Sequence, residues 1–550
     1  MSLSNQKQLK FYEKLIEIGI KKANNKDFSG AQKDFLKAVK LDKKNPNAYI
    51  NLSNIYIIHK EINKAVKILM DYVYKYKNNE TILNHTAKFL YTYNLKEDLL
   101  ELFNQTKLNI NKNYNKNYYL YFIQGLYFEK EEKYQNAKDS FFKSISYNDT
   151  HFEGYIKLLN LYEQTNELKN FNELIKKGFD NFISKEKIII ILFYKSLLLS
   201  REKKFKDSQK IIIDNNLYVE LKNNKIFFYR LLDIEAKNNE KLKNYKQAFQ
   251  KIKERNNIIL NLNENKNFDG RNIYNSIDKY KIFFTKSNLD KINSKINYQN
   301  DENLVFLIGF PRSGTTLLDN ILRSHSEITV LEEKPYLLNL RHDFFKQNDN
   351  DLSSLLNITQ DIRDKIRNQY FKKIFSQISK NRRIIVDKFP LTIIELGFVK
   401  SIFPNAKIIL AMRHPCDVVT SCFFSSFKMN DAMINFLSWS STIQFYNKVF
   451  DLFEFYSDEF NLNFITIKYE DLIINFKDNV QKMTKFMGLK YENNMENFFL
   501  TAKNRSRIST PSYSQVINPL YTTSINRWKN YPNTKETHKQ LNKWIKKFNY

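Results

Sequence analysis

Cysteine, glycine and proline are scarce in this chain, which has 550 residues but only two cysteines, ten glycines and nine prolines. The two thiols, Cys416 and Cys422, give neither a disulfide framework nor a zinc-binding pattern, because either would need more ligands or pairs. Proteins of reducing compartments rarely carry disulfides, so we expect this protein to come from such a compartment.

Long hydrophobic runs are also missing. The N-terminal sequence MSLSNQKQLKFYEKLIEIG is polar and lacks the apolar run of a signal peptide. The run that comes closest to a membrane span, IIIILFYKSLLL from Ile188, includes Lys195 and is shorter than the roughly 20 residues that cross a bilayer. The sequence therefore predicts a soluble, cytoplasmic protein with no membrane span.

Acidic residues are outnumbered, since 59 Asp and Glu stand against 88 Lys and Arg and the formal net charge is +29. Such a charge is compatible with binding nucleic acid, acidic lipid or an anionic small molecule. Lys, Asn, Ile, Phe and Tyr are abundant along the whole chain, however, which is typical of nucleotide bias in a coding sequence. We attribute most of the charge to that bias. Because no common RNA-binding motif occurs, we expect no nucleic-acid partner.

Apolar residues recur at every third and fourth position over 10–260, a pattern typical of helices. Within it, a weak repeat of about 34 residues places small and large residues at matching positions, as in Ala31 with Phe35 and Ala65 with Leu69. This segment resembles a helical array of tetratricopeptide (TPR) repeats, with a generic helical solenoid as the alternative. The concave face of such an array commonly holds a peptide or protein partner. The alternative is that the array only supports the second half.

The sequence period changes after a polar connection at 261–300, which we expect to be a linker. Short apolar runs then alternate with helical stretches: LVFLIGF, ITVL, RIIVDKF, KIILAMR and FITIKY. This spacing predicts an α/β domain over 301–550, with a central parallel sheet and helices on both faces. Ligands of such sheets bind at the carboxyl ends of the strands, where the chemically interesting residues of this chain also stand.

The stretch LVFLIGFPRSGTT, from Leu304 to Thr316, has the order strand, glycine loop, helix. This arrangement directs backbone N–H groups and the positive end of a helix at an anion. The loop nearly matches the nucleotide-binding pattern G-x-x-x-x-G-K-[ST], but Thr315 stands at the lysine position and Arg312 is the nearest cation. Asp387 follows an apolar run but lies in the motif DKFP, so no convincing magnesium ligand is present. We therefore expect a P-loop-like site for a nucleotide that needs no metal.

The motif PRSGTT resembles the 5′-phosphosulfate loop of sulfotransferases that use 3′-phosphoadenosine 5′-phosphosulfate (PAPS). A second element of that family is an arginine followed eight residues later by a serine, which holds the 3′-phosphate, and Arg413 and Ser421 match it in MRHPCDVVTS. A planar guanidinium can fork onto phosphate oxygens, which suits this role. The resemblance implies that the loop residues bind the co-substrate: Arg312, Ser313, Gly314, Thr315 and Thr316.

Within the family, residues 303–535 are most similar to the branch that includes tyrosylprotein sulfotransferases. In that branch an acidic motif after the first helix supplies the general base, and VLEEKP places Glu333 there, with Glu332 as the alternative. The motif DKFP maps Lys388 onto a residue that steadies the transferring group together with Arg312. Cations already in place lower the barrier to sulfuryl transfer, because negative charge spreads over the oxygens.

The C-terminal sequence STPSYSQVINPLYTTSINRW resembles the segment that closes over the nucleotide in this branch. The resemblance implies a transition-state contact for Ser512 and a nucleotide contact for Arg527, which stands where the branch has lysine. Tyr469, in IKYEDL, matches a tyrosine on the adenine side, with a core aromatic as the alternative. Ser425 departs from the pattern, since the branch has an arginine there. The animal members of this branch are Golgi membrane proteins with disulfides, and this sequence shows neither feature.

The resulting hypothesis is a PAPS-dependent sulfotransferase that acts on a hydroxyl acceptor, with protein tyrosine as one candidate beside polysaccharide, lipid and small-molecule hydroxyls. No metal is expected, because no cluster of His, Asp and Glu occurs. The extended helical array favours a polypeptide or polymer acceptor. The alternatives are a P-loop nucleotide phosphotransferase and a TPR scaffold with an inactive nucleotide-binding domain.

Overall fold

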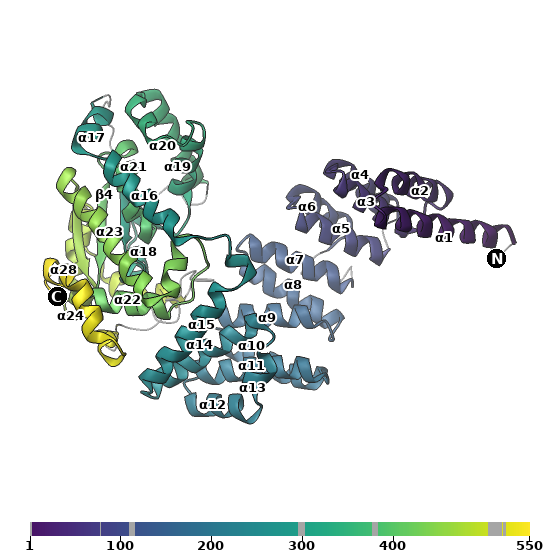
Figure 1. The fold of residues 1–550 in the computed structure, drawn as a ribbon, viewed down its shortest axis with the longest axis horizontal. Coiled ribbons are helices and arrows are strands. Elements are labelled where there is room, and N and C mark those ends of the chain that lie inside the picture. The colour runs from purple at the N-terminus through teal and green to yellow at the C-terminus, as the bar shows by residue number, and fades with distance from the viewer. Residues whose placement is uncertain are drawn as a thin grey trace. The chain divides into compact units, whose positions relative to one another are not determined.

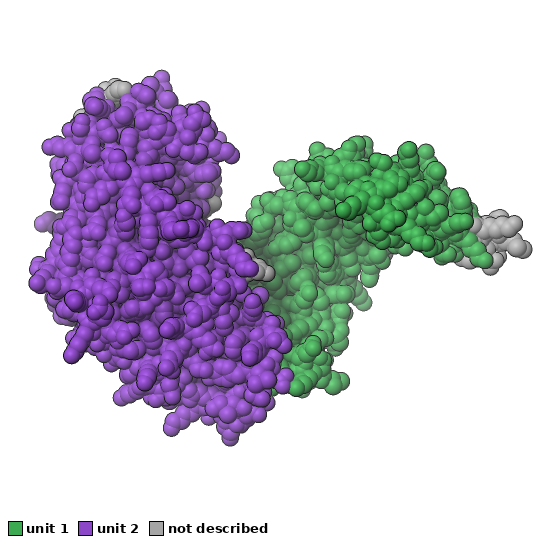
Figure 2. Space-filling model, in the orientation of Figure 1, with its two compact units in different colours: residues 1–194 green, residues 195–550 purple. Residues whose placement is uncertain are grey.

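The computed structural model describes residues 3–76, 79–108, 116–294, 303–376, 383–503, 520 and 524–550, without the side chains of 3–7 and 263. The chain divides into two compact units, residues 1–194 and 195–550, which Figure 2 shows in green and purple. The division falls within helix α11 (Lys185–Arg201). This division reflects compactness and does not test where the repeat domain, the linker and the α/β domain begin and end. The boundaries expected at 10–260, 261–300 and 301–550 therefore stay a prediction.

The described part of the first unit consists of helices that contact their neighbours in consecutive pairs (Figure 1). Before α11 these helices are α1 (Leu3–Asn24), α2 (Phe28–Leu41), α3 (Pro46–Ile58), α4 (Ile62–Lys75), α5 (Glu80–Thr92), α6 (Lys96–Gln105), α7 (Tyr118–Lys130), α8 (Tyr134–Tyr147), α9 (Phe152–Gln164) and α10 (Leu168–Asn181). The expected TPR-like helical solenoid is confirmed for this part of the chain.

The repeat has a physical basis in its turns and in its small residues. Lys26, Lys60 and Asn94 have positive φ values and lie between paired helices, about 34 residues apart. An added Cβ at Gly125 of α7 would lie 2.5 Å from the ring of Phe141 of α8, so glycine allows this close approach.

None of the helices within the described ranges, α11 included, is long and apolar enough to cross a membrane.

The second unit begins with further helices. They are α12 (Phe205–Asp214), α13 (Leu217–Leu221), α14 (Lys225–Lys241), α15 (Tyr245–Leu260), the short 3-10 helix η1 (Asn263–Asn265), α16 (Gly270–Phe283) and α17 (Lys286–Asn293). Helices α16 and α17 lie within the expected linker, yet Ile277, Tyr280 and Ile292 are buried in the larger core of the α/β domain. The structure thus shows much of this polar connection folded onto the core.

Five parallel strands form one sheet in the order β2-β3-β1-β4-β5. The strands are β1 (Leu304–Gly309), β2 (Ile328–Glu332), β3 (Ile384–Lys388), β4 (Lys407–Met412) and β5 (Phe464–Lys468). Their side chains alternate between two cores, with Phe306 and Ile308 on one face of β1 and Val305 and Leu307 on the other. All five predicted apolar runs are strands, which confirms the predicted α/β domain with a central parallel sheet.

Helices cover both faces of this sheet. In addition to α16 and α17, the helices of the larger core are α19 (Tyr336–Lys346), α20 (Gln360–Phe375), α21 (Leu396–Ile402), α22 (Pro415–Phe424), α23 (Trp439–Glu459) and α28 (Thr534–Lys547). Those of the smaller core are α18 (Thr315–Arg323), α24 (Tyr469–Ile474), α25 (Phe476–Phe486) and α26 (Phe498–Lys503). Short 3-10 helices are η2 (Leu352–Asn357), η3 (Pro390–Glu395), η4 (Met433–Leu437), η5 (Asn493–Asn497) and η6 (Arg527–Asn530).

Candidate active site

The loop between β1 and α18 is a cradle of backbone atoms. β1 ends at Gly309, where an added Cβ would lie 2.6 Å from the Ala411 carbonyl oxygen, so glycine allows β1 and β4 to approach here. Arg312 and Gly314 have positive φ values of 70° and 95°, which turn the chain sharply before α18 begins at Thr315. The first turn of a helix carries N–H groups that the helix does not satisfy itself. They favour a bound anion.

Two arginines and a serine from different elements meet beside this loop. Arg413 follows β4, and its Nη1 donates to the Arg312 carbonyl oxygen at 3.4 Å. The Nε of Arg312 donates to Ser421 Oγ of α22 at 3.0 Å. The Arg413 guanidinium lies 4.9 Å from the centre of the Tyr469 ring, and Tyr469 also lies 3.0 Å from the Cβ position of Gly314. The structure therefore brings five of the predicted site residues together.

The side chain of Arg413 fits an anionic ligand. It is buried, and its Nε has no hydrogen-bond partner among the described residues. The carboxylate of Asp417 is 4.0 Å away, and it accepts hydrogen bonds from the backbone N–H groups of Asn526 and Trp528 at 2.8 and 2.9 Å. Nη2 donates to the Ser524 carbonyl oxygen at 2.6 Å, so Nε is the buried donor of this guanidinium that favours an anion from outside.

Lys388 forms a second cluster at the end of β3. Its side chain is fully buried, and Nζ donates to Glu333 Oε1 at 2.9 Å. The same nitrogen lies 3.7 Å from Glu332 and 3.8 Å from Asp319. Strand register explains this meeting, because Lys388 is paired with Leu307 of β1 and with Glu332 of β2. The cluster contains a fixed cation surrounded by three carboxylates.

Glu333 is the most exposed carboxylate of this cluster, since 33% of its side chain is accessible, against 10% for Glu332 and none for Asp319. Its backbone N–H donates to the Lys388 carbonyl oxygen at 2.8 Å, which fixes the turn after β2. A base that takes a proton from an outside hydroxyl needs such access, so the geometry favours Glu333 over Glu332.

Asp319, the third carboxylate of the cluster, was not predicted. Its place one turn after Thr315 could have indicated it, because residues i and i+4 share a helix face.

Asp387, weighed in the sequence as a magnesium ligand, is a buried carboxyl group on β3. The hydroxyl of Tyr370 donates to its Oδ2 at 2.6 Å. Burial raises the pKa of Asp387 from its ordinary 3.8 to about 7, although the hydrogen bond from Tyr370 and the charge of Lys388 act in the opposite direction. The native carboxyl group therefore keeps its proton well above the pH at which an unfolded chain loses it.

We expect Asp387→Asn to stabilise the protein increasingly as the pH rises from about 4 to 7. In this range the native carboxyl group is protonated and the unfolded one is ionised, so ionisation favours unfolding of the wild type only. At pH 7 the wild type should have lost at most about 4 kcal/mol of unfolding free energy relative to the variant. Urea unfolding of both proteins at pH 4.5 and 7.5 measures this loss, and a difference that does not change with pH would contradict it.

Arg527 makes its described contacts outside these two clusters. The Nε and Nη2 of Arg527 donate to the Glu240 carboxylate of α14 at 2.5 and 2.8 Å, and the guanidinium packs over the rings of Phe424 and Tyr531. Burial alone raises the pKa of Glu240, but the charge and hydrogen bonds of Arg527 outweigh it and lower that pKa. The described contacts thus place Arg527 beside α14, and Ser512 lies outside the described residues.

The described ranges contain no group of three or more His, Cys, Asp or Glu that could hold a metal ion. The absence of a metal stays a prediction.

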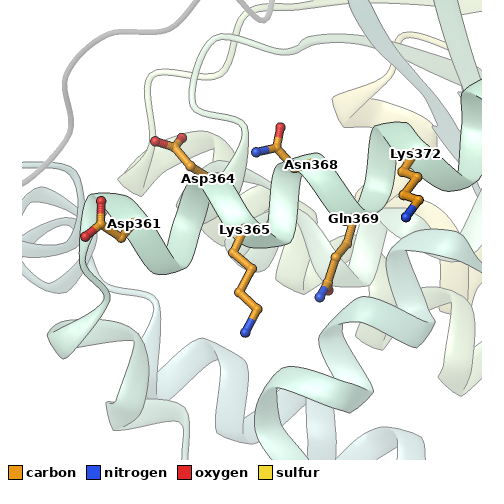
Figure 3. A pocket seen from close by; sticks show the side chains of 6 residues that line it. All are labelled: Asp361, Asp364, Lys365, Asn368, Gln369 and Lys372. Carbon is orange, nitrogen blue, oxygen red and sulfur yellow. The ribbon is translucent and has the colours of Figure 1, made fainter.

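An open hollow of about 410 Å³ lies along α20, and Figure 3 shows the six side chains that line it: Asp361, Asp364, Lys365, Asn368, Gln369 and Lys372. All six come from one helix and none belongs to either cluster, so we assign the hollow no role in the site.

A family profile described as "Sulfotransferase family" matches residues 305–493. A protein of Aquifex aeolicus (strain VF5) is 24% identical over 302 residues, which are 53% of this chain and 38% of that protein. Protein-tyrosine sulfotransferase A of Caenorhabditis elegans is 24% identical over 252 residues, which are 44% of this chain and 64% of that protein. The chain therefore spans less than two thirds of the length of either relative.

Among solved structures, the sulfotransferase domain from the Synechococcus PCC 7002 olefin synthase is similar to part of this chain. It is 19% identical with a TM-score of 0.33, and the match covers 46% of this chain and 98% of that domain.

Proposed function

We propose that the protein transfers a sulfuryl group from PAPS to a hydroxyl acceptor, since residues 305–493 match the profile of the sulfotransferase family. The observation that carries the proposal is the meeting of Arg312, Arg413 and Ser421 beside the glycine loop. The pair of Lys388 and Glu333 stands at the end of the neighbouring strand β3. An anion site beside a fixed cation and an accessible carboxylate favours transfer over binding alone.

The loop and α22 would hold the donor. We assign the 3′-phosphate to Arg413 and Ser421, and the 5′-phosphosulfate to the loop residues Arg312, Ser313, Gly314, Thr315 and Thr316. Tyr469 lies under the Arg413 guanidinium, which supports a place for it on the adenine side. For Arg527 a nucleotide contact rests on the family resemblance alone, because its described partners are Glu240 and Tyr531.

PAPS supplies an activated sulfuryl group. Glu333 would accept the proton of the acceptor hydroxyl as its oxygen bonds to sulfur and the bond to the phosphate oxygen breaks. Lys388 and Arg312 would stabilise the negative charge on the transferring and leaving oxygens, and their fixed positions reduce the reorganisation needed in the transition state. The proposed contact of Ser512 with the same group stays a prediction.

Protein tyrosine is the acceptor that we place first, because the Caenorhabditis elegans relative bears the name of a protein-tyrosine sulfotransferase. A TPR-like array offers an extended surface for a polypeptide, which supports the same choice and a protein partner on its concave face. Polysaccharide, lipid and small-molecule hydroxyls are the competing acceptors.

The proposal is tested with the full chain, radiolabelled PAPS and a panel of tyrosine peptides, sugars and phenols. We expect label to pass to one class of acceptor without added magnesium, and adenosine 3′,5′-bisphosphate to bind in calorimetry. Failure of this bisphosphate to bind would overturn the assignment of the donor site. Magnesium-dependent turnover of ATP with no transfer from PAPS would favour a nucleotide phosphotransferase instead.

A further inference from the structure

The position of α22 decides the geometry of the phosphate-binding groups. This helix carries Ser421 and begins at Pro415, two residues after Arg413. Its first turn is tied to the C-terminal segment, because Asp417 accepts the N–H groups of Asn526 and Trp528. A group that holds the last turn of α22 would therefore complete the positioning of Ser421.

Arg255 of α15 occupies that place. It is fully buried, and it donates from Nη2 to the Phe423 carbonyl oxygen at 3.0 Å and from Nη1 to that of Phe424 at 3.1 Å. The Nδ2 of Asn256 donates to the Phe423 carbonyl oxygen as well, at 3.3 Å. A helix leaves the carbonyl groups of its last turn without internal donors, and its C-terminal end favours a cation. Arg255 supplies hydrogen-bond donors and a positive charge at this end of α22, and its charge is balanced by an ion pair with Asp233 of α14.

The rest of the α14–α15 hairpin packs on the same region. The two helices contact each other along their length (Figure 1). The ring of Phe249 of α15 stacks at 5.3 Å on Phe423 and meets Trp439 edge-on at 5.2 Å. Glu240 of α14 binds Arg527 next to the same end of α22. Aromatic packing, the hydrogen bonds of Arg255 and a partly buried ion pair thus fasten the hairpin to the region around the helix of the phosphate-binding serine.

We propose that the last helical hairpin is a structural part of the nucleotide site and that Arg255 is a positioning residue for Ser421. The inference rests on the proposed function, since it takes Ser421 and Arg413 as phosphate ligands. Ser421 lies three residues before Phe424, so release of the last turn displaces its hydroxyl group. Because Arg312 donates to that hydroxyl group, the displacement also reaches the glycine loop.

The test compares Arg255→Met and Arg255→Lys with the wild type in the full chain. Arg255→Met should weaken binding of adenosine 3′,5′-bisphosphate about tenfold in calorimetry. It should also raise KM for the donor while KM for the acceptor stays unchanged. Arg255→Lys keeps the positive charge but loses the planar, forked donors of arginine. Its bisphosphate affinity and its KM for the donor should therefore lie between those of the wild type and Arg255→Met. Hydrogen exchange without nucleotide should be faster in the last turn of α22 and unchanged in α18.

Lys251→Met is the matched control. Lys251 is a cation on the same helix, but its partners are Glu235 and Tyr218, so bisphosphate affinity and exchange in α22 should not change. Equal affinity and equal exchange in Arg255→Met and the wild type would overturn the inference. If Arg255→Met does not unfold cooperatively, Arg255→Lys decides by the same two measurements. A wild type that binds no bisphosphate would overturn the proposed function, and exchange in α22 would still decide whether Arg255 positions the helix.

Discussion

Glu333→Gln should lower kcat for sulfuryl transfer about 10²- to 10⁴-fold, because the amide cannot accept the proton of the acceptor hydroxyl group. The substitution keeps the size of the side chain and an oxygen that can accept the hydrogen bond from Lys388. Binding of adenosine 3′,5′-bisphosphate should therefore stay unchanged. Initial rates with radiolabelled PAPS and the best acceptor of the panel measure the loss, together with calorimetry of the bisphosphate.

Glu332→Gln is the matched control, since Glu332 is the adjacent carboxylate and lies 3.7 Å from the same lysine nitrogen. It is largely buried, so we expect a loss of kcat well below that of Glu333→Gln. A larger loss for Glu332→Gln would move the base to that residue. Wild-type kcat in both variants would contradict carboxylate catalysis by this motif.

Arg413→Met should weaken binding of adenosine 3′,5′-bisphosphate at least about 100-fold, because a charge-assisted hydrogen bond contributes about 1.5–3 kcal/mol and a guanidinium can make two to one phosphate. Arg413→Lys keeps the charge but not the fork, so its affinity should be intermediate. Calorimetry with the bisphosphate and with adenosine 5′-monophosphate checks the assignment. The loss should be large for the first ligand and small for the second, which lacks the 3′-phosphate.

Arg383→Met serves as a control for net charge. Arg383 precedes β3 in the same domain and is mostly exposed, so its loss should leave both affinities unchanged. An Arg413→Met variant that unfolds at the wild-type temperature and binds the bisphosphate normally would remove Arg413 from the site. Equal losses for both nucleotides would place Arg413 away from the 3′-phosphate.

Much of the α/β domain was predictable because its signals are local. The five apolar runs became the five strands, and the central strands β1 and β4 are almost wholly buried, as expected of a parallel sheet covered on both faces. The loop from Gly309 to Gly314 was also readable, because its glycines serve a close approach and a positive φ that the motif itself requires. The meeting of Arg312, Arg413 and Ser421 was expected only through a family resemblance, since they come from two separate loops and a helix.

The groups that the sequence did not reveal act over long separations. Asp319 joins the Lys388 cluster from α18. Arg255 reaches the end of α22 across more than 160 positions, and Glu240 reaches Arg527 across more than 280. No local pattern marks Arg255 or Glu240 as such a partner, because a buried arginine or glutamate on a helix has the same spacing as a solvent-exposed one.

Sequence alone determined the helical array, the order of strands and helices along the chain, and the glycine loop, because side-chain period and glycine placement act within a few residues. The tertiary structure decided which carboxylate of the acidic motif is accessible, where Arg527 lies, and which helices hold α22. These depend on strand register and on packing between distant segments, which bring charges together that are far apart in the chain.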